Sequence, residues 1–82
     1  MIDIIRDIID SKLGESFSHA MTEDSMWIRH KSIVKFRCQI YSYDNHVVLF
    51  HRGPAVILDT NNPNFVNDFV DAVLRLAGEK NQ

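Results

Sequence analysis

A strict alternation of side-chain type between residues 26 and 43 constrains the fold more than any other feature of the sequence. Even positions here are mostly apolar, whereas odd positions carry the cations and several rings. Because successive side chains of a β-strand point to opposite sides, the pattern predicts one apolar face and one basic, aromatic face. We interpret the stretch as one long, bent strand. The alternative is a break near Lys31 and Ser32, where only a loop of odd length would keep the two faces apart.

Shorter alternating segments on both sides of this stretch predict neighbouring strands. A polar turn precedes Met26, and Asp44-Asn45 is typical of a two-residue turn between strands. Pairing Phe17 with His30 and Ile40 with Leu49 places the apolar sides together, so each register is self-consistent. The sequence therefore predicts an antiparallel meander of four strands, over residues 16–21, 26–43, 46–51 and 55–58.

A helix is predicted at each end of the chain. Over residues 2–13 apolar side chains recur every three or four positions, and Gly14 is a typical helix end. Asn62-Pro63 predicts the start of a second amphipathic helix, which Gly78 ends. We expect residues 79–82 to be a frayed tail.

These elements predict a single α+β domain over residues 1–82, built as a two-layer sandwich with both helices on one face of the sheet. The opposite face is left uncovered. The net charge is −2, yet residues 25–55 carry +4 and the remainder −6. We therefore expect a positive sheet and negative helices.

The uncovered face is the predicted site. Exposed apolar patches usually mark interaction surfaces, and aromatic and arginine residues are enriched in the centres of interfaces. We expect Trp27, Tyr41 and Phe50 to anchor a partner, and the cations to steer and orient it. The predicted partner-binding residues are Trp27, Arg29, Lys31, Lys35, Arg37, Tyr41, Tyr43, Val48 and Phe50.

No catalytic motif, metal site or cofactor site is predicted. Cys38 falls on the apolar side of its strand, as a buried hydrophobe does, and it shares that side with His30 and His51. These three residues lack the spacing of metal ligands, and isolated glycines form no phosphate loop. A single cysteine suits a reducing cytoplasm, where we place the protein. The N-terminal segment has acids and no basic region, unlike a secretory signal, and no apolar run approaches the roughly 20 residues of a membrane span.

We therefore expect a small, non-enzymatic protein-binding module. Its size and single interaction face suit an inhibitor, antagonist or accessory regulator, in the style of phage or mobile-element proteins. With 82 residues the core contributes only a few kcal/mol net, so homodimerisation or a partner is an expected supplement. The alternative function is binding of single-stranded nucleic acid, with bases stacked on the rings and phosphates held by the cations.

Overall fold

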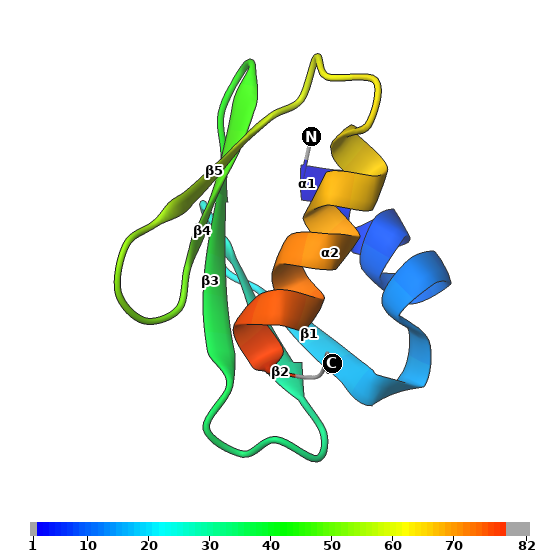
Figure 1. The fold of residues 1–82 in the computed structure, drawn as a ribbon, viewed down its shortest axis with the longest axis vertical. Coiled ribbons are helices and arrows are strands. Elements are labelled where there is room, and N and C mark those ends of the chain that lie inside the picture. Colours follow the sequence, from blue (N-terminus) through cyan, green and yellow to red (C-terminus); the bar gives the residue numbers. More distant parts are fainter. Residues whose placement is uncertain (1, 79–82) are drawn as a thin grey trace.

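The computed structural model describes residues 2–78, and the tail expected over residues 79–82 lies outside them. A helix at each end flanks a five-stranded antiparallel sheet with the strand order β1-β2-β3-β4-β5 (Figure 1). The elements are α1 (Ile2–Ile8), η1 (Ile9–Leu13), η2 (Gly14–Ser16), β1 (Phe17–Met21), β2 (Met26–His30), β3 (Arg37–Ser42), β4 (His46–Phe50), β5 (Val56–Asp59) and α2 (Phe65–Ala77).

The prediction of one long strand over residues 26–43 is wrong, because β2 and β3 are separate strands joined by the loop 31–36. The loop contains no glycine, and the His30 ring stabilises it by providing a hydrogen-bond acceptor for its backbone. Its Nδ1 accepts hydrogen bonds from the backbone N–H groups of Ser32 (3.0 Å) and Ile33 (3.1 Å). The loop therefore closes on a side-chain acceptor, and the sheet has five strands where four were predicted.

The alternation of faces survives this break. Met26 pairs with Ile40 and Ile28 with Cys38, so apolar residues still meet apolar residues. The predicted registers of the other hairpins are confirmed: Phe17 pairs with His30, and Ile40 with Leu49. Hydrophobic patterning fixed the pairing even where the strand boundaries were misplaced, because a one-residue slip would expose the whole apolar set.

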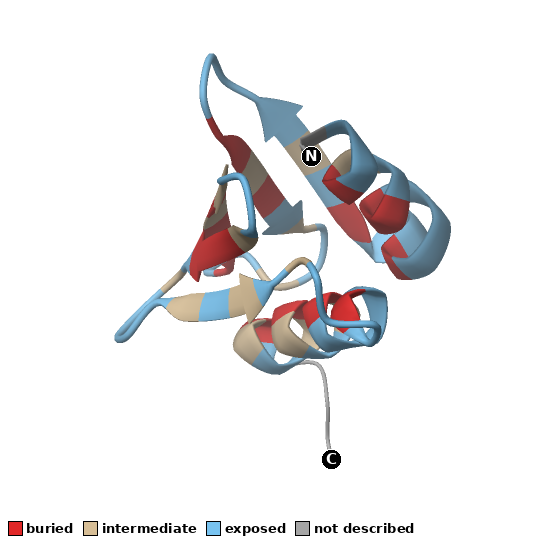
Figure 2. Cartoon of the chain, turned by 90° about the horizontal axis from the view of Figure 1, so that it is seen from above, coloured by how far each residue is buried: buried red, intermediate tan, exposed pale blue. Residues whose placement is uncertain are grey.

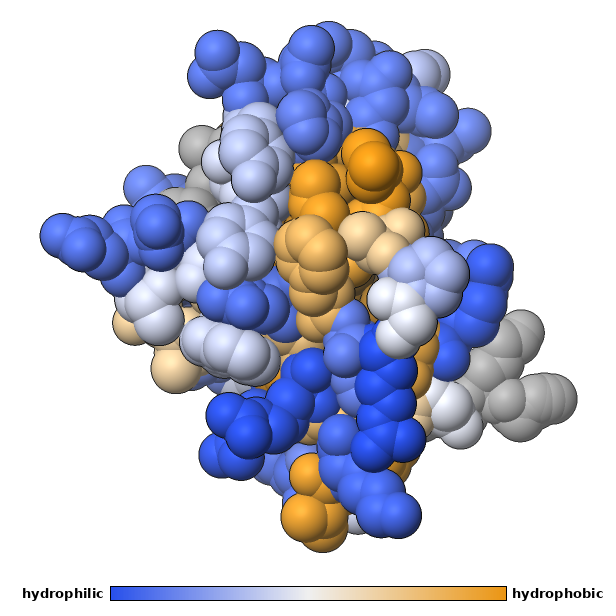
Figure 3. All heavy atoms as spheres, turned by 90° about the vertical axis from the view of Figure 1, so that its left-hand side faces the viewer, coloured by the Kyte–Doolittle hydropathy of each residue, from blue (hydrophilic) through white to orange (hydrophobic). Residues whose placement is uncertain are grey.

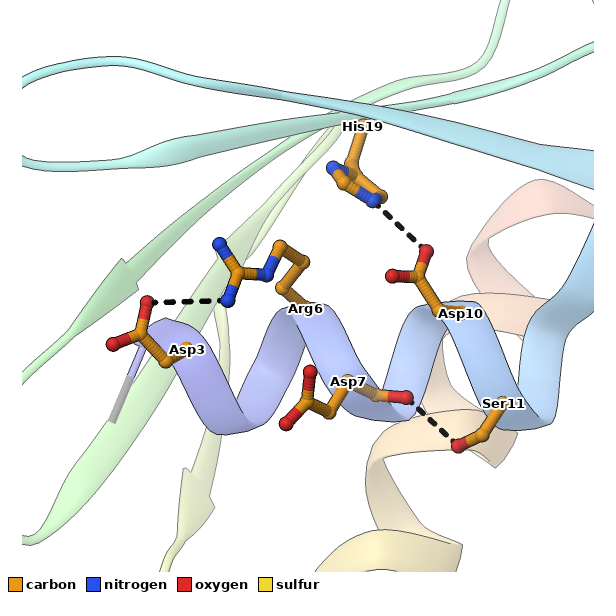
Figure 4. Close-up of polar contacts among 6 residues, drawn as sticks. All are labelled: Asp3, Arg6, Asp7, Asp10, Ser11 and His19. Carbon is orange, nitrogen blue, oxygen red and sulfur yellow. Dashed lines mark hydrogen bonds and ion pairs between the residues drawn. The ribbon is translucent and has the colours of Figure 1, made fainter.

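The predicted N-terminal helix is confirmed in extent, but its second half is a π-helix. Ser11 Oγ donates to the carbonyl of Asp7 at 2.7 Å, a back-bond of the kind that bends helices. The Gly14 N–H then bonds the Ile9 carbonyl, five residues back. From this segment Asp10 reaches His19 on β1, with 3.0 Å between Oδ1 and Nε2 (Figure 4).

The second helix begins at Phe65, two residues later than the predicted proline start. Asn62 still organises the approach. Its side-chain oxygen accepts the Asn64 N–H at 2.8 Å, and its carbonyl accepts the Phe65 N–H at 2.9 Å. Asn62 therefore shapes the turn that precedes the helix. Gly78, at φ 75° and ψ 18°, ends the helix as predicted.

One buried cluster contains residues of α1, η1, α2 and the apolar side of the sheet. Buried and exposed residues are interspersed along the helices and along β2 and β3 (Figure 2), whereas three successive residues of β4 are buried. The Phe36 ring, from the loop 31–36, also belongs to this cluster at 1% exposure. Within residues 2–78, no helix has the length and apolar character required to cross a membrane.

Candidate interaction surface

The outer face is the face of the sheet that carries no residue of the buried cluster described above. Its strand positions follow from register, because paired residues of antiparallel strands point to the same side. They form four cross-strand rows, spaced by two residues or about 7 Å along the strands. In order, the rows are Ser18–Arg29–Arg37, Ala20–Trp27–Gln39–Phe50, Tyr41–Val48–Ile57 and Tyr43–His46–Asp59.

The first row is basic, and the loop next to it extends its charge. Arg29 and Arg37 are direct partners across β2 and β3 and are both exposed. Lys31 and Lys35, predicted on the strand itself, lie exposed in the loop 31–36 at the same end of the sheet. The four cations therefore gather at one end of the outer face and not along its length.

The second row is joined to the first through its tryptophan. The guanidinium carbon of Arg37 lies 5.3 Å from the centre of the Trp27 ring, within cation–π distance. Ala20, Trp27, Arg29 and Arg37 line a shallow hollow between the two rows. An anionic group with an apolar neighbour would find a cation and a ring face together there.

The third row is the apolar centre of the face. Tyr41 is half-buried and meets Phe50 of the second row edge to face, with 5.7 Å between ring centres. Val48, predicted as a contact residue, pairs with Tyr41 and Ile57 across the strands and is only 8% exposed. Phe50 and Ile57 remain 44% and 67% exposed. A second hollow is lined by Gln39, Tyr41, Tyr43 and Phe50.

The fourth row ends the face with an acid. The Tyr43 and His46 rings stack with 4.7 Å between centres, and Asp59 pairs with His46 across β4 and β5. Asp59 was not predicted as part of this face, because the last strand was predicted to end at residue 58. The available signal was its position two residues after Ile57, which places both side chains on the same side of a strand. Asp44 lies in the adjoining turn.

Figure 3 views the molecule from the sheet side of Figure 1. Hydrophobic surface occupies the upper middle of this view, and strongly hydrophilic side chains lie below and above it. This distribution agrees with the order of the rows. Ile33 holds an odd position, so the alternation predicts it on the outer face. Instead it lies in the loop 31–36, is half-buried and packs against the core.

The reactive groups on the inner side differ in burial: Cys38 is fully buried, whereas His30 and His51 are half-buried. Burial raises the pKa of the Cys38 thiol to about 12, so the thiolate needed for nucleophilic or metal chemistry is scarce at neutral pH. His51 Nδ1 lies 3.0 Å from the Arg37 carbonyl oxygen. Across residues 2–78, no group of three or more His, Cys, Asp or Glu side chains is placed to hold a metal ion.

Comparison of the chain with protein-family models, with curated proteins and with solved structures finds no match.

Proposed function

We propose that this protein is a small, non-enzymatic binding module that acts through the outer face. In this role it is an inhibitor, antagonist or accessory regulator in the style of phage and mobile-element proteins, working in the cytoplasm and self-associating. One observation carries the proposal: Phe50 and Ile57 remain exposed beside the half-buried Tyr41, on a face that contributes no residue to the buried cluster. Contiguous apolar surface of this kind usually serves a partner.

The proposal includes a two-layer arrangement in which both helices cover the inner face. Two contacts support it. His19, on the inner side of β1, bonds Asp10 of η1, and a shallow groove is lined by Val56 and Leu58 of β5 together with residues of α2. In Figure 1 both helices are drawn to the right of β3, β4 and β5. With the helices on that side, the outer face is open to a partner.

In binding, the aromatic residues and the arginines of the rows would have different roles. Trp27, Tyr41 and Phe50 supply rigid, amphipathic contact area, and Arg29 and Arg37 orient the partner through directional hydrogen bonds. Positive charge at one end raises the rate of encounter with an acidic surface. The protein would act by occluding whatever surface it covers.

The test removes the rings without touching the core. The variant Tyr41→Ser/Phe50→Ser is compared with the wild type and with Val34→Ser, which removes an 86% exposed apolar side chain from the loop 31–36. Each protein is immobilised, and proteins retained from lysate are quantified by mass spectrometry. The proposal expects retention by the wild type and by Val34→Ser, and loss with the ring variant. Equal retention by all three would contradict it.

Single-stranded nucleic acid is the second candidate, favoured by the contact between Arg37 and Trp27. A phosphate on the arginines would place a base near the ring. Titration of labelled single-stranded RNA and DNA across salt concentrations, followed by Trp27 fluorescence, tests it. Quenching together with a steep salt dependence would place nucleic acid ahead of protein. No binding at low salt would remove it.

A further inference from the structure

The outer face is electrically polarised along its strands. Two arginines occupy the first row, and two lysines lie in the loop next to it. At the opposite end Asp59 lies in the fourth row and Asp44 in the adjoining turn, with Glu23 and Asp24 in the turn between β1 and β2. Six residues of extended chain separate the first and fourth rows, roughly 20 Å. Because the screening length is about 8 Å at physiological salt, the two ends act as separate charges.

This gradient decides which partners fit. A phosphate backbone carries charge at every nucleotide, so the half lying over the acidic end would be repelled. A uniformly acidic protein surface meets the same difficulty. From the first row to the fourth, the outer face is basic, then apolar, then acidic. A surface that matches it along its whole length is therefore acidic, then apolar, then basic over the same rows.

We propose that this surface is the outer face of a second copy of the chain, packed face to face with its strands antiparallel to those of the first. A two-fold axis between the sheets and perpendicular to the strands generates this arrangement. It places the first row of each copy against the fourth row of the other, and the second row against the third. Such a two-fold interface uses one self-complementary patch on both subunits. The dimer presupposes the proposed function, because it assigns an occupant to the same face.

Charge selects this two-fold arrangement over the other one available. An axis parallel to the strands would bring the basic first row of each copy against the same row of the other, and the acidic fourth row against the fourth. With the axis across the strands each cationic end meets a carboxylate end. The Phe50, Tyr43 and Ile57 side chains, between 44% and 67% exposed in the single chain, would be covered. Facing sheets about 10 Å apart allow such side chains to interdigitate.

The test uses charge reversal at the two ends. One variant carries Arg29→Asp/Arg37→Asp and a second carries Asp44→Arg/Asp59→Arg; the control Asp7→Arg/Asp68→Arg makes a reversal of equal size on the helices. Each is checked for folding by circular dichroism, and its mass is measured by sedimentation across concentration. The wild type and the control should be dimers. Each face variant alone should dimerise more than about tenfold more weakly, since like charges then meet at both ends. An equimolar mixture of the two variants should restore the dimer, because an all-acidic face then meets an all-basic one.

Three outcomes would overturn the dimer. The first is a monomeric wild type at millimolar concentration. The second is a dimer that Tyr41→Ser/Phe50→Ser leaves intact, which would place the interface elsewhere. The third is a mixture that dimerises no better than either variant. The first outcome would also end the self-association included in the proposed function. Binding of a partner through the outer face still stands if the ring variant loses a retained protein, so the two failures can be told apart.

Discussion

Truncation of Phe50 and truncation of Phe36 should have very different effects on stability. Both are phenylalanines of the same sheet region, but Phe36 is 1% exposed and lies in the core, whereas Phe50 is 44% exposed on the outer face. Phe36 contacts Phe17 and His51, with ring centres 5.9 Å and 4.9 Å away. Phe50 has one ring neighbour, Tyr41. The two truncations therefore compare a side chain that contributes to the core with one that is exposed on the candidate binding surface.

The magnitudes follow from burial. Replacing a buried phenylalanine by alanine costs about 3–5 kcal/mol, through lost transfer free energy and a residual cavity. For Phe50, about half of a full burial term is at stake, together with an aromatic pair, so Phe50→Ala should cost about 1–2 kcal/mol. A chain of 82 residues has a free energy of unfolding of roughly 4–12 kcal/mol. Phe36→Ala therefore removes a large part of the stability, and Phe50→Ala a small part.

Thermal denaturation followed by far-ultraviolet circular dichroism measures both variants at a protein concentration where each is monomeric. Expected shifts in Tm are about 4–16 °C for Phe50→Ala and more than about 12 °C for Phe36→Ala. Equal losses of stability would refute the reasoning, because Phe50 would then belong to the folding core. In that case the rings of the outer face would be required for stability, and their exposure would no longer indicate a binding surface.

Three further changes test other parts of the fold. Since burial raises the pKa of the Cys38 thiol from 9.0 to about 12, the unfolded chain loses this proton first as pH rises. The free energy of unfolding should therefore fall by about 1 kcal/mol between pH 9 and pH 10, and parallel curves for the wild type and Cys38→Ala would contradict this. Gly78→Asn should cost less than about 1 kcal/mol in thermal melts, whereas Gly14→Asn, at φ 63° and ψ −141°, should cost about 2 kcal/mol; the reverse order would be inconsistent with the two backbone conformations. Asp10→Asn should cost under about 1 kcal/mol in urea, because the carboxylate that meets His19 is 61% exposed, and a larger loss would make this contact a structural anchor.

The folding pattern of the strands was readable from the sequence, but their number was not. The alternation predicted that Ile40 faces the core and that Trp27 faces away from it. The same assignment holds on both sides of the loop 31–36, because β2 and β3 pair even positions with even and odd with odd. The break itself depends on the His30 ring accepting two backbone N–H groups. The periodicity of the sequence does not indicate that a histidine ring will accept hydrogen bonds from the backbone of the loop that follows it. The same limit applies to α2, whose start was displaced by the turn around Asn62.

The candidate surface was predicted as a set of residue types and was arranged only by the fold. The sequence identified Trp27, Tyr41 and Phe50 from their parity, but it treated the cations as a continuous positive face. Pairing across strands is long-range, so only the assembled sheet places Arg29 beside Arg37 at one end and Asp59 beside His46 at the other.

By itself, the sequence determined an α+β chain, the apolar side of its sheet and three of its strand pairings, because local alternation and helical periodicity encode which side of each element is buried. Tertiary structure decided where the central stretch breaks, that Val48 is buried, and that charge runs from basic to acidic along the outer face. The last two properties arise from contacts between residues that are distant in the chain, and such contacts exist only once the sheet has assembled. The break depends on a local contact, in which the His30 ring accepts two backbone N–H groups, and no periodicity encodes it.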